Sequence, residues 1–380
     1  MPHATLRRSS LVIATAYLAL TAHAAPPQVV KLGFAAPLTG PQAHYGADMK
    51  AGIVLALEDV NKQAPVIAGK SVKFELLAED DQADPKTATS VAQRFVDQKV
   101  SGVIGHFNSG TSIPASRIYA DAGIPQIAMA TAPAFTAQGF KTTFRAMTSD
   151  TQQGSVMGGF VVKKLGLKKV AIIDDRTAYG QGLADQFELA AKAAGGVIVQ
   201  REYTNDKATD FASILTSIRA KQPDVIFYGG ADTQSAPLTL QMRRLGMKAQ
   251  LVSGEMTRTD NYLKLAGNAA DGVIASLAGL PMEKTPGSAA LVARVKARFG
   301  AADFYAPYSY DATMVMVQAM QAANSTEPAR YLPFLAKTRY SGATSAEIAY
   351  DARGDLKHGD ITVYRADKGK WSVMETVSGI

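Results

Sequence analysis

Four acidic residues close together are the first place where this chain could do chemistry. Glu79, Asp80 and Asp81 end an apolar run, and Asp84 follows shortly after. Clustered carboxylates hold divalent cations in many proteins, so a cation site is one interpretation. The other needs no ligand, because Asp84 followed by Pro85 is a typical helix start, with the aspartate as N-cap and the proline in the first turn. We favour the second interpretation, a solvated strand end followed by a helix cap.

The standard catalytic signatures are incomplete. The chain has neither a Gly-x-x-x-x-Gly-Lys-Ser/Thr phosphate loop nor a Gly-x-Ser-x-Gly nucleophile elbow. Gly180-Gln-Gly182 begins a dinucleotide fingerprint, but Asp185 stands where its third glycine belongs. Beyond the first 24 residues the histidines are His44, His106 and His358, none at metal-ligand spacing from another. Because the chain also lacks cysteine, thiol nucleophiles, thiolate metal sites and disulfides are excluded. We expect no enzyme and no bound metal or cofactor, and a binding protein is the better interpretation.

Predicted strands and helices alternate along the chain with short connections. In the first part, strands are expected over 29–36, 72–79, 100–105 and 124–130, and helices over 45–61, 84–97 and 111–121. The order restarts near Asp150, with helices over 151–166, 182–194, 210–221 and 234–246, and strands over 169–174, 197–203, 224–228 and 250–253. From about Asp271 follow a strand over 273–277, helices over 288–299 and 308–323, and a β-rich tail. This alternation predicts βαβ units and a parallel sheet covered on both faces, in two similar lobes. No low-complexity linker separates the lobes, which indicates that the chain crosses between them more than once.

The N-terminus predicts export. Arg7 and Arg8 precede a short apolar run over 11–20, which ends in Ala22-His-Ala24. A charged start, an apolar run and a small-x-small site are typical of a secretory signal peptide. The run is shorter than the ~20 apolar residues that span a bilayer. The alternative, a buried N-terminal helix, is disfavoured by Pro26-Pro27. We predict a signal peptide over 1–24, cleaved after Ala24, and a mature protein outside the cytoplasm.

Composition and charge narrow the classes further. With 47% hydrophobic and 19% charged residues, the chain is typical of a globular protein of two domains. The formal net charge of +7 is spread along the sequence without a Lys/Arg run, so no nucleic-acid partner is expected. No second long apolar segment follows the first, so we expect a protein that is soluble or held only at a surface.

Short motifs spread along the whole chain carry a family resemblance. In chain order they are Pro37–Pro41, Tyr45–Gly46, Asp80–Pro85, Gly105–Ser109, Pro114–Ser116, Ala130–Pro133, Phe144–Arg145, Tyr179–Gly182, Tyr228–Gly230, Gly254–Glu255 and Tyr350–Leu356. Their order over about residues 29–375 resembles the periplasmic leucine/isoleucine/valine-binding proteins that serve ABC importers. The resemblance implies the type I periplasmic binding fold: two Rossmann-like lobes joined by three crossovers, with a ligand cleft between them. The crossovers would fall near Ser149, Ala278 and Val363, giving lobes over 25–149 plus 278–362 and over 150–277 plus 363–380.

The resemblance also implies which residues hold the ligand. Ser109 and Thr131 would bond the backbone of an amino acid, and the main chain at Met129 would contribute a carbonyl. Glu255 falls where the family keeps an acid that pairs with the ammonium. This agrees with the chemistry of a zwitterion, because a desolvated charge must be paired and hydrogen-bonded. A carboxylate is also favoured at a helix N-terminus such as the one expected near Thr111. Without the resemblance, Ser109 and Thr131 would be read as turn or capping residues and Glu255 equally well as a surface carboxylate.

Four aromatic residues fall at the family's pocket-wall positions. They are Tyr45, Phe107, Tyr179 and Tyr305. Aromatic rings suit such a wall because each offers a large apolar face, and a tyrosine adds a polar tip. Taken singly, each would more often be a core or surface residue.

Two departures from the family pattern bear on specificity. Well-known members have a disulfide at the positions of Ala83 and Asn108, so here Asn108 adds an amide beside the pocket. A wall aromatic is replaced by Ala231, which enlarges the side-chain pocket, and the adjacent Asp232 could meet a polar or cationic group. Leucine as the sole ligand is therefore in doubt.

The sequence thus favours a periplasmic receptor for a branched-chain or other bulky apolar L-amino acid. It would be a monomer that closes by a hinge and delivers its ligand to ABC permease subunits in the inner membrane. Three alternatives stay open. The same fold could bind an aromatic acid, an amide or another small metabolite, or it could act as a sensor for a separate receptor. An exported hydrolase is the least favoured, because no nucleophile–base pair is apparent.

Overall fold

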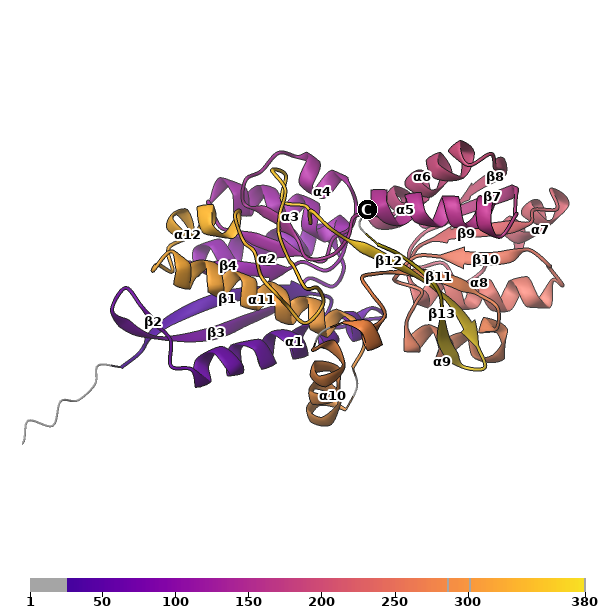
Figure 1. Ribbon diagram of the computed structural model, residues 1–380. Helices are drawn as coiled ribbons and strands as arrows, with labels where there is room; N and C mark the ends of the chain where they lie inside the picture. Colours follow the sequence, from indigo (N-terminus) through magenta and orange to yellow (C-terminus); the bar gives the residue numbers. More distant parts are fainter. Residues whose placement is uncertain (1–25, 286, 301, 379–380) are drawn as a thin grey trace, which may run out of the picture.

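The computed structural model describes residues 26–285, 287–300 and 302–378, which form two α/β lobes lying side by side (Figure 1). The predicted signal peptide and its cleavage site lie outside the described residues. Each lobe is built on one sheet with helices packed against it. The predicted fold class, two α/β lobes, is confirmed.

Lobe 1 contains a six-stranded sheet in the order β2-β3-β1-β4-β5-β6, parallel except for the β2–β3 hairpin. Its strands are β1 (Gln28–Ala36), β2 (Val66–Ile67), β3 (Lys70–Asp80), β4 (Gly102–Gly105), β5 (Gln126–Ala128) and β6 (Thr143–Arg145). Its helices are α1 (Ala43–Lys62), α2 (Pro85–Asp97), α3 (Ser109–Asp121), α4 (Ala134–Ala137), α10 (Ser288–Phe299), α11 (Tyr305–Ala322) and α12 (Pro328–Leu335). Helices cover both faces of the sheet. In β1, Phe34 packs in the same apolar cluster as α1 and α11, and Ala35 packs in the cluster of α2 and α3. Because successive residues of a strand point to opposite faces, the part of β1 that is covered on both sides, Leu32–Ala36, contains no polar side chain.

Lobe 2 contains a seven-stranded sheet in the order β13-β12-β11-β10-β9-β7-β8. Its strands are β7 (Lys169–Asp174), β8 (Val197–Tyr203), β9 (Val225–Gly229), β10 (Gln250–Ser253), β11 (Ile274–Ala278), β12 (Asp360–Asp367) and β13 (Lys370–Ser378). Its helices are α5 (Asp150–Gly159), continued by a π-helical turn (Phe160–Lys164), α6 (Ala178–Ala193), α7 (Ala212–Ala220), α8 (Asp232–Arg244) and α9 (Asp260–Ala266). Two short 3₁₀ turns follow, at Gly267–Ala270 and Met282–Lys284. The strands from β8 to β11 pair in parallel, and the chain end adds the antiparallel pairs β11–β12 and β12–β13.

The chain passes between the sheets where α5 follows β6, where α10 follows β11, and again before β12 (Figure 1). We propose lobe boundaries near Ser149, Ala278 and Asp360. The third lies slightly before the predicted position near Val363, because β12 already pairs with β11 at Ile361. Three passes between lobes without a flexible linker are what a hinge requires.

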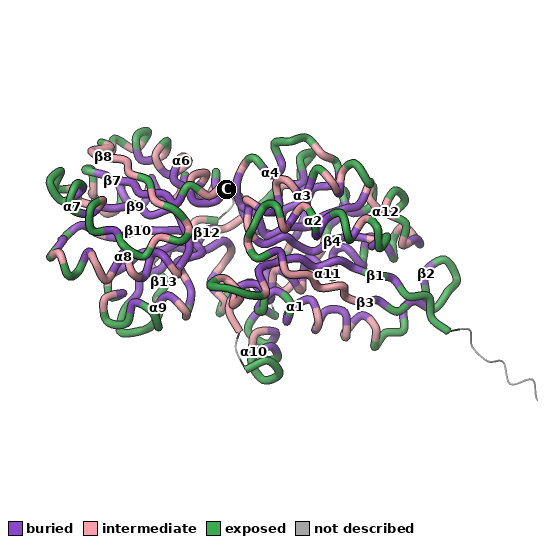
Figure 2. Tube along the Cα trace, turned by 180° about the vertical axis from the view of Figure 1, so that it is seen from behind, coloured by how far each residue is buried: buried purple, intermediate pink, exposed green. Residues whose placement is uncertain are grey.

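Buried residues fill both sheets and continue across the boundary between the lobes (Figure 2). The largest apolar cluster joins lobe 1 side chains such as Tyr45 and Tyr305 to lobe 2 side chains such as Tyr179, Ala231 and Met256. The structure therefore represents a form in which the lobes are shut on each other.

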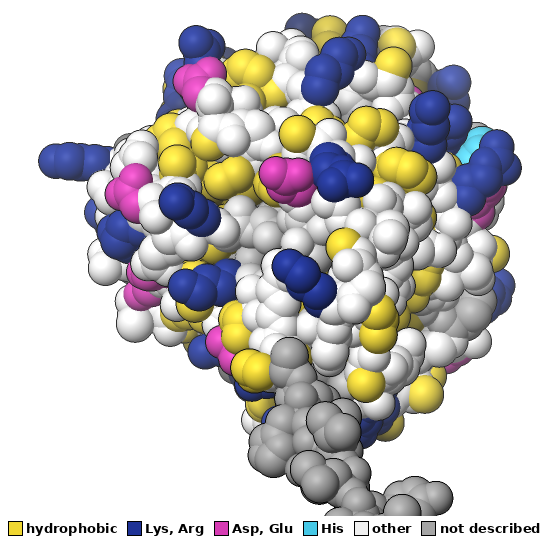
Figure 3. Space-filling view, turned by 90° about the vertical axis from the view of Figure 1, so that its left-hand side faces the viewer, with side chains coloured by type: hydrophobic (Ala, Val, Ile, Leu, Met, Phe, Trp, Pro, Cys, Tyr) yellow, Lys and Arg dark blue, Asp and Glu magenta, His cyan; other side chains and the backbone are white. Residues whose placement is uncertain are grey.

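The outer surface of lobe 1 is mixed in character. On the end that faces away from lobe 2, basic, acidic and apolar side chains are interspersed (Figure 3). Among the described residues, no helix combines the length and the apolar character that crossing a membrane would need.

Candidate functional site

Two loops at one edge of the lobe 1 sheet bring predicted ligand residues together. Phe107 and Asn108 link β4 to α3, Ser109 is the first residue of α3, and Met129 and Thr131 follow β5. Because β4 and β5 are parallel neighbours, both loops leave the same edge of the sheet, where α/β proteins bind ligands. Ala132 N donates to Ser109 Oγ at 3.2 Å, which ties the loops to each other. Ser109, Met129 and Thr131 are all buried.

Three aromatic side chains of lobe 1 pack against one another beside these loops. The rings of Tyr45 and Phe107 stack at 4.8 Å, and Tyr305 meets Phe107 edge-on at 4.9 Å. Tyr45 Oη reaches across to lobe 2 and donates to Met256 O at 2.7 Å. The Tyr305 hydroxyl is buried and has no hydrogen-bond partner among the described residues. The predicted aromatic wall thus includes a polar group that is free to bond a ligand.

Glu255 is the acidic centre of the lobe 2 face. Its side chain is buried, and Tyr179 Oη donates to Oε2 at 3.0 Å. Gln153 Nε2 donates to the same oxygen, and Thr131 Oγ1 lies 3.5 Å from Oε1, across the boundary between the lobes. Burial raises the pKa of Glu255 above its ordinary range. The geometry brings together Thr131, Tyr179 and Glu255, three residues predicted from the sequence to share a site.

A second carboxylate, which the sequence did not reveal, lies beside Glu255. Asp150 begins α5 and is fully buried, and no described residue makes a well-formed hydrogen bond to its carboxylate oxygens. Thr131 and Gln153 lie near enough to stabilise its ionised form in part. Burial first, and then repulsion by Glu255, raise the pKa of Asp150 well above its ordinary range. Nearby Arg145 is held elsewhere, by Asp355 at 2.7 Å. Two adjacent buried carboxyl groups can either share a proton or pair with a positively charged group, which makes them candidates for a ligand contact.

Asp232, predicted to be able to meet a polar or cationic group, contacts a residue of the other lobe, and its contact with a ligand stays a prediction. It begins α8, and its Oδ2 lies 2.9 Å from His44 Nε2 of lobe 1. The same oxygen accepts hydrogen bonds from Thr259 Oγ1 at 2.7 Å and Asn261 Nδ2 at 3.1 Å. Asp232 therefore links the lobes, and only its Oδ1 has no partner among the described residues.

A cavity of about 490 Å³ lies between the lobes, next to these residues. Its walls include Asn108 from lobe 1 and Tyr179 and Ala231 from lobe 2, three of the predicted site residues. Glu255 does not line the cavity itself, but it accepts a hydrogen bond from Tyr179, which does. Ala83 and Asn108, where the family's disulfide would stand, both border this cavity. The volume is within the range of small-molecule sites.

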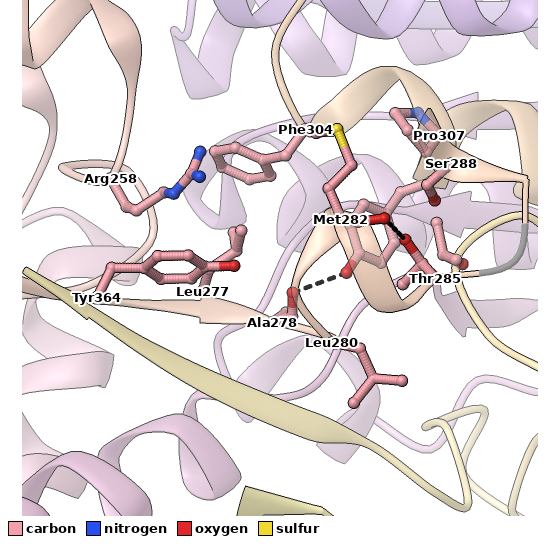
Figure 4. A pocket seen from close by; sticks show the side chains of 12 residues that line it. Arg258, Leu277, Ala278, Leu280, Met282, Thr285, Ser288, Phe304, Pro307 and Tyr364 are labelled. Atoms are coloured by element: carbon pink, nitrogen blue, oxygen red, sulfur yellow. Dashed lines mark hydrogen bonds between the residues drawn. The ribbon is translucent and has the colours of Figure 1, made fainter. Parts of the chain in front are cut away.

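A second cavity, at the hinge side, is much smaller, about 30 Å³. Arg258 lies there between the rings of Phe304 and Tyr364 (Figure 4), with its guanidinium carbon 4.5 Å from the centre of the Tyr364 ring. Arg258 Nη1 also lies 3.9 Å from Asp303 Oδ1 of lobe 1. A space of this size holds about one water molecule. It therefore belongs to the contacts that shut the lobes and not to a ligand site.

The four acidic residues that follow one another closely in the sequence, Glu79, Asp80, Asp81 and Asp84, have a structural role. Asp84 caps α2, with Oδ1 accepting from Thr87 N at 2.7 Å, as predicted. Asp80 accepts from Leu38 N at 2.8 Å, and the buried Asp81 bonds His106 Nδ1 at 2.7 Å. Within the described ranges, no group of three or more acidic, histidine or cysteine side chains is arranged to hold a metal ion.

The incomplete dinucleotide motif also has a structural explanation. At Gly180, near the start of α6, a Cβ atom would lie 2.2 Å from Asp175 Oδ1 and 2.5 Å from Gly229 O. Only glycine allows this close approach of the helix to the strand end. The motif therefore serves packing at the cleft edge.

Two α/β lobes shut on a cleft with paired carboxylates, hydroxyls and aromatic rings define a ligand-binding protein of the hinged, two-lobed class. The profile of the family described as periplasmic binding protein matches residues 29–370, and the chain belongs to that family.

Relatives and solved structures agree with this assignment. The chain is 34% identical over 341 residues to "Leu/Ile/Val-binding protein homolog 1" of Brucella suis, covering 90% of this chain and 91% of that protein. It is 30% identical over 370 residues to the "Leucine-, isoleucine-, valine-, threonine-, and alanine-binding protein" of Pseudomonas aeruginosa, covering 97% and 98%. The crystal structure of a leucine-binding protein from Thermotoga maritima superposes with a TM-score of 0.84 at 25% identity, covering 92% of this chain and 98% of that one. The predicted family is confirmed.

Proposed function

We propose that this protein is the periplasmic substrate-binding component of an ABC importer for L-amino acids. The pair of buried carboxylates, Glu255 and Asp150, carries this proposal. An α-ammonium group placed between them would supply the missing positive charge, and the α-carboxylate would lie at Ser109 and Thr131, near the N-terminus of α3. The names of the Brucella and Pseudomonas relatives support the same ligand class.

The part of the site that would receive the ligand's side chain favours a sizeable apolar group next to the ligand's ammonium and carboxylate. Phe107, Tyr179 and Tyr305 offer apolar faces there, and Ala231 leaves space where a larger residue would fill it. Branched-chain and other bulky L-amino acids fit this environment.

Binding and closure are one equilibrium in this proposal. Tyr45, His44 and Arg258 take part in contacts between the lobes. A zwitterion that touches Ser109 of lobe 1 and Glu255 of lobe 2 has its full set of contacts only when the lobes are shut, and so shifts the population toward that form. The shut form is presented to inner-membrane permease subunits, and the ATPase is a separate chain. We expect the protein to work as a monomer.

A thermal-shift screen on refolded, ligand-free protein tests the ligand class. Ligand at about 100 times Kd adds roughly 2.7 kcal/mol to the free energy of unfolding, which raises the melting temperature measurably. We expect L-leucine and L-phenylalanine to stabilise the protein. The matched control is 4-methyl-2-oxopentanoate, which is leucine with a keto group in place of the ammonium, and it should have little effect. Stabilisation by the keto acid, by benzoate or by amides, but by no amino acid, would contradict the proposal.

Location and partners need separate tests. N-terminal sequencing of the protein from a periplasmic extract should begin at Ala25 if the signal peptide is cleaved after Ala24. Permease and ATPase genes beside this one would support import, whereas a neighbouring kinase or cyclase gene would favour a sensor.

A further inference from the structure

The cavity between the lobes continues beyond the apolar wall into a polar region. Next to Tyr179, Ala231 and Met256, its lining changes to polar residues, among them the acids Asp175 and Asp206 and the cation Arg176. Taking about 30 Å³ for a water-sized group, 490 Å³ corresponds to roughly 16 such groups, far more than a leucine side chain fills. The polar residues that line the outer part of the cavity therefore have no role in binding an apolar side chain.

Asp175 is the most unusual group in this outer part. It follows β7, and its side chain is only 4% exposed. Both hydrogen bonds to its carboxylate go to Oδ1, from Thr177 N at 3.0 Å and from Thr177 Oγ1 at 2.6 Å. No described residue donates to Oδ2. Oδ2 therefore keeps some contact with the cavity, and in so buried a residue it needs a ligand or water as its donor.

The nearby cation does not satisfy Asp175. The guanidinium carbon of Arg176 lies 3.5 Å from the centre of the Tyr203 ring, and its Nε lies 3.9 Å from Asp174 Oδ1. Asp206 adds negative charge on the same side and disfavours ionisation of Asp175, whose pKa is raised to about 6, chiefly by burial. A ligand cation placed there would relieve both the desolvation and the repulsion.

The opposite wall presents a second acceptor. Asn108 Nδ2 donates to Gln42 Oε1 at 2.7 Å, and this bond turns Asn108 Oδ1 away as an acceptor that is buried and without a partner among the described residues. Asp175 and Asn108 belong to different lobes and line the same cavity. Both offer an oxygen that lacks a donor, so the complementary ligand group is one that donates several hydrogen bonds.

Tyr179 connects this outer region to the proposed backbone site. Its hydroxyl donates to Glu255, and its side chain forms part of the cavity wall. A ligand whose ammonium is at Glu255 and Asp150 would extend its side chain past Tyr179 and Ala231 before reaching Asp175. The intermediate stretch is apolar and suits a chain of methylene groups.

We propose that the protein prefers L-amino acids whose long side chain ends in a hydrogen-bond-donating cation, the side-chain end being held between Asp175 and Asn108. This rests on the proposed amino-acid function and specifies its substrate class. The amino acid's aliphatic stem uses the apolar wall, and the terminal ammonium or guanidinium uses the outer region.

The test compares two ligands that differ in one group. L-lysine is L-norleucine with a terminal ammonium, so titration calorimetry of both on refolded protein isolates the outer region. We expect L-lysine or L-arginine to bind at least about tenfold more tightly than L-norleucine. In Asp175→Asn the preference should disappear while norleucine binding is kept, because the amide oxygen can still accept from Thr177. Asp97→Asn, on the exposed face of α2, makes the same charge change away from the cavity and should leave the preference intact.

The outcomes separate this inference from the proposed function. If norleucine or leucine binds and neither basic amino acid binds more tightly, the inference is wrong and the proposed function stands. An equal loss of preference in Asp97→Asn would show a long-range charge effect and would also overturn it. If no amino acid binds at all, both fail.

Discussion

The two lobes present different chemistry to the cleft between them. Lobe 1 contributes hydroxyls and aromatic rings, from Ser109, Thr131, Phe107, Tyr45 and Tyr305. Lobe 2 contributes carboxylates, from Asp150, Asp175, Asp232 and Glu255, all of them at least nine-tenths buried. The acids of lobe 1 near this boundary, Asp48 and Asp303, lie close to Tyr305, whereas lobe 2 places most of the buried carboxylates at the cleft.

In the proposed function, this difference makes closure depend on the charge of the ligand. Packing lobe 1 onto the carboxylates of lobe 2 removes water from them, and burial raises the pKa values of Glu255, Asp150 and Asp175. A cationic group offsets this cost only if it reaches lobe 2 while the rest of the ligand contacts lobe 1. Charge selectivity then resides in lobe 2, and the fit of the aliphatic part depends on both.

Among the substitutions in lobe 2, Glu255→Gln should weaken ligand binding most strongly. Removing one partner of a buried charge pair costs about 2–5 kcal/mol, which is roughly 30-fold to several thousand-fold in Kd. Glutamine keeps the shape and one acceptor oxygen, so we expect the lower half of this range. Isothermal titration measures the loss, and circular dichroism should show unchanged folding. A loss below about threefold would mean that Glu255 does not hold an ammonium.

Ala231→Tyr tests the space that lobe 2 leaves for the side chain. A ring at this position would overpack the cavity for a large ligand, at a cost of about 1–3 kcal/mol, or roughly 5- to 150-fold in Kd. Binding of L-phenylalanine should fall accordingly, and L-valine should lose much less. An unchanged ligand ranking in competition titrations would show that Ala231 does not contact the side chain.

Asp150→Asn distinguishes the contribution of Asp150 from that of the neighbouring Glu255. In the wild type, an ammonium ligand favours ionised Asp150, so affinity should increase as pH rises through the raised pKa of Asp150 and decrease at lower pH. The variant should lose about tenfold in affinity at alkaline pH. It should also show a flatter pH profile between pH 5.5 and 8.5 by calorimetry. A pH profile identical to that of the wild type would place the titrating group elsewhere.

Asp303→Asn probes lobe 1 at an acid that lies near the hinge, beside Arg258. Burial, with repulsion by Asp48, raises the pKa of Asp303 to about 7, and burial raises that of Asp48 to about 6. Their folded pKa values exceed the unfolded ones. The stability they contribute is therefore full below about pH 4 and is lost as pH rises through 6 to 7. Urea unfolding should show the variant more stable than the wild type at pH 8, by at least about 1 kcal/mol, and similar at pH 4. Equal stability at both pH values would contradict this account.

The fold could be predicted from the sequence because neighbouring residues specify each helix and strand. The predicted strand over 169–174 coincides with β7 (Lys169–Asp174), and Asp84 caps α2 as expected. Errors occurred at helix starts. The helix predicted from Gly182 begins at Ala178, because Thr177 Oγ1 caps it by accepting from Gly180 N at 2.9 Å. Likewise, the helix predicted from Thr111 begins at Ser109, which puts Ser109 in its first turn.

The predicted site residues are close together in the fold, and their contacts with a ligand stay a prediction. The sequence did not reveal Asp150, Gln153, Asp175 or His44. No local motif singles out these residues, because the surroundings that matter for each come from parts of the fold far away in the chain. His44 meets Asp232 across 188 positions, and Gln153 meets Glu255 across 102.

By itself, the sequence determined the alternation of strands and helices, the two lobes, the family, and a site at the ends of parallel strands. These follow from periodicity, caps and motif order, which are properties of neighbouring residues. Only the tertiary structure decided that Asp150 lies beside Glu255, that Asp232 bonds His44, and that Asp175 and Asn108 face one cavity. The physical reason is that burial and charge pairing depend on how two separately folded sheets close on each other, and no short stretch of sequence encodes that relation.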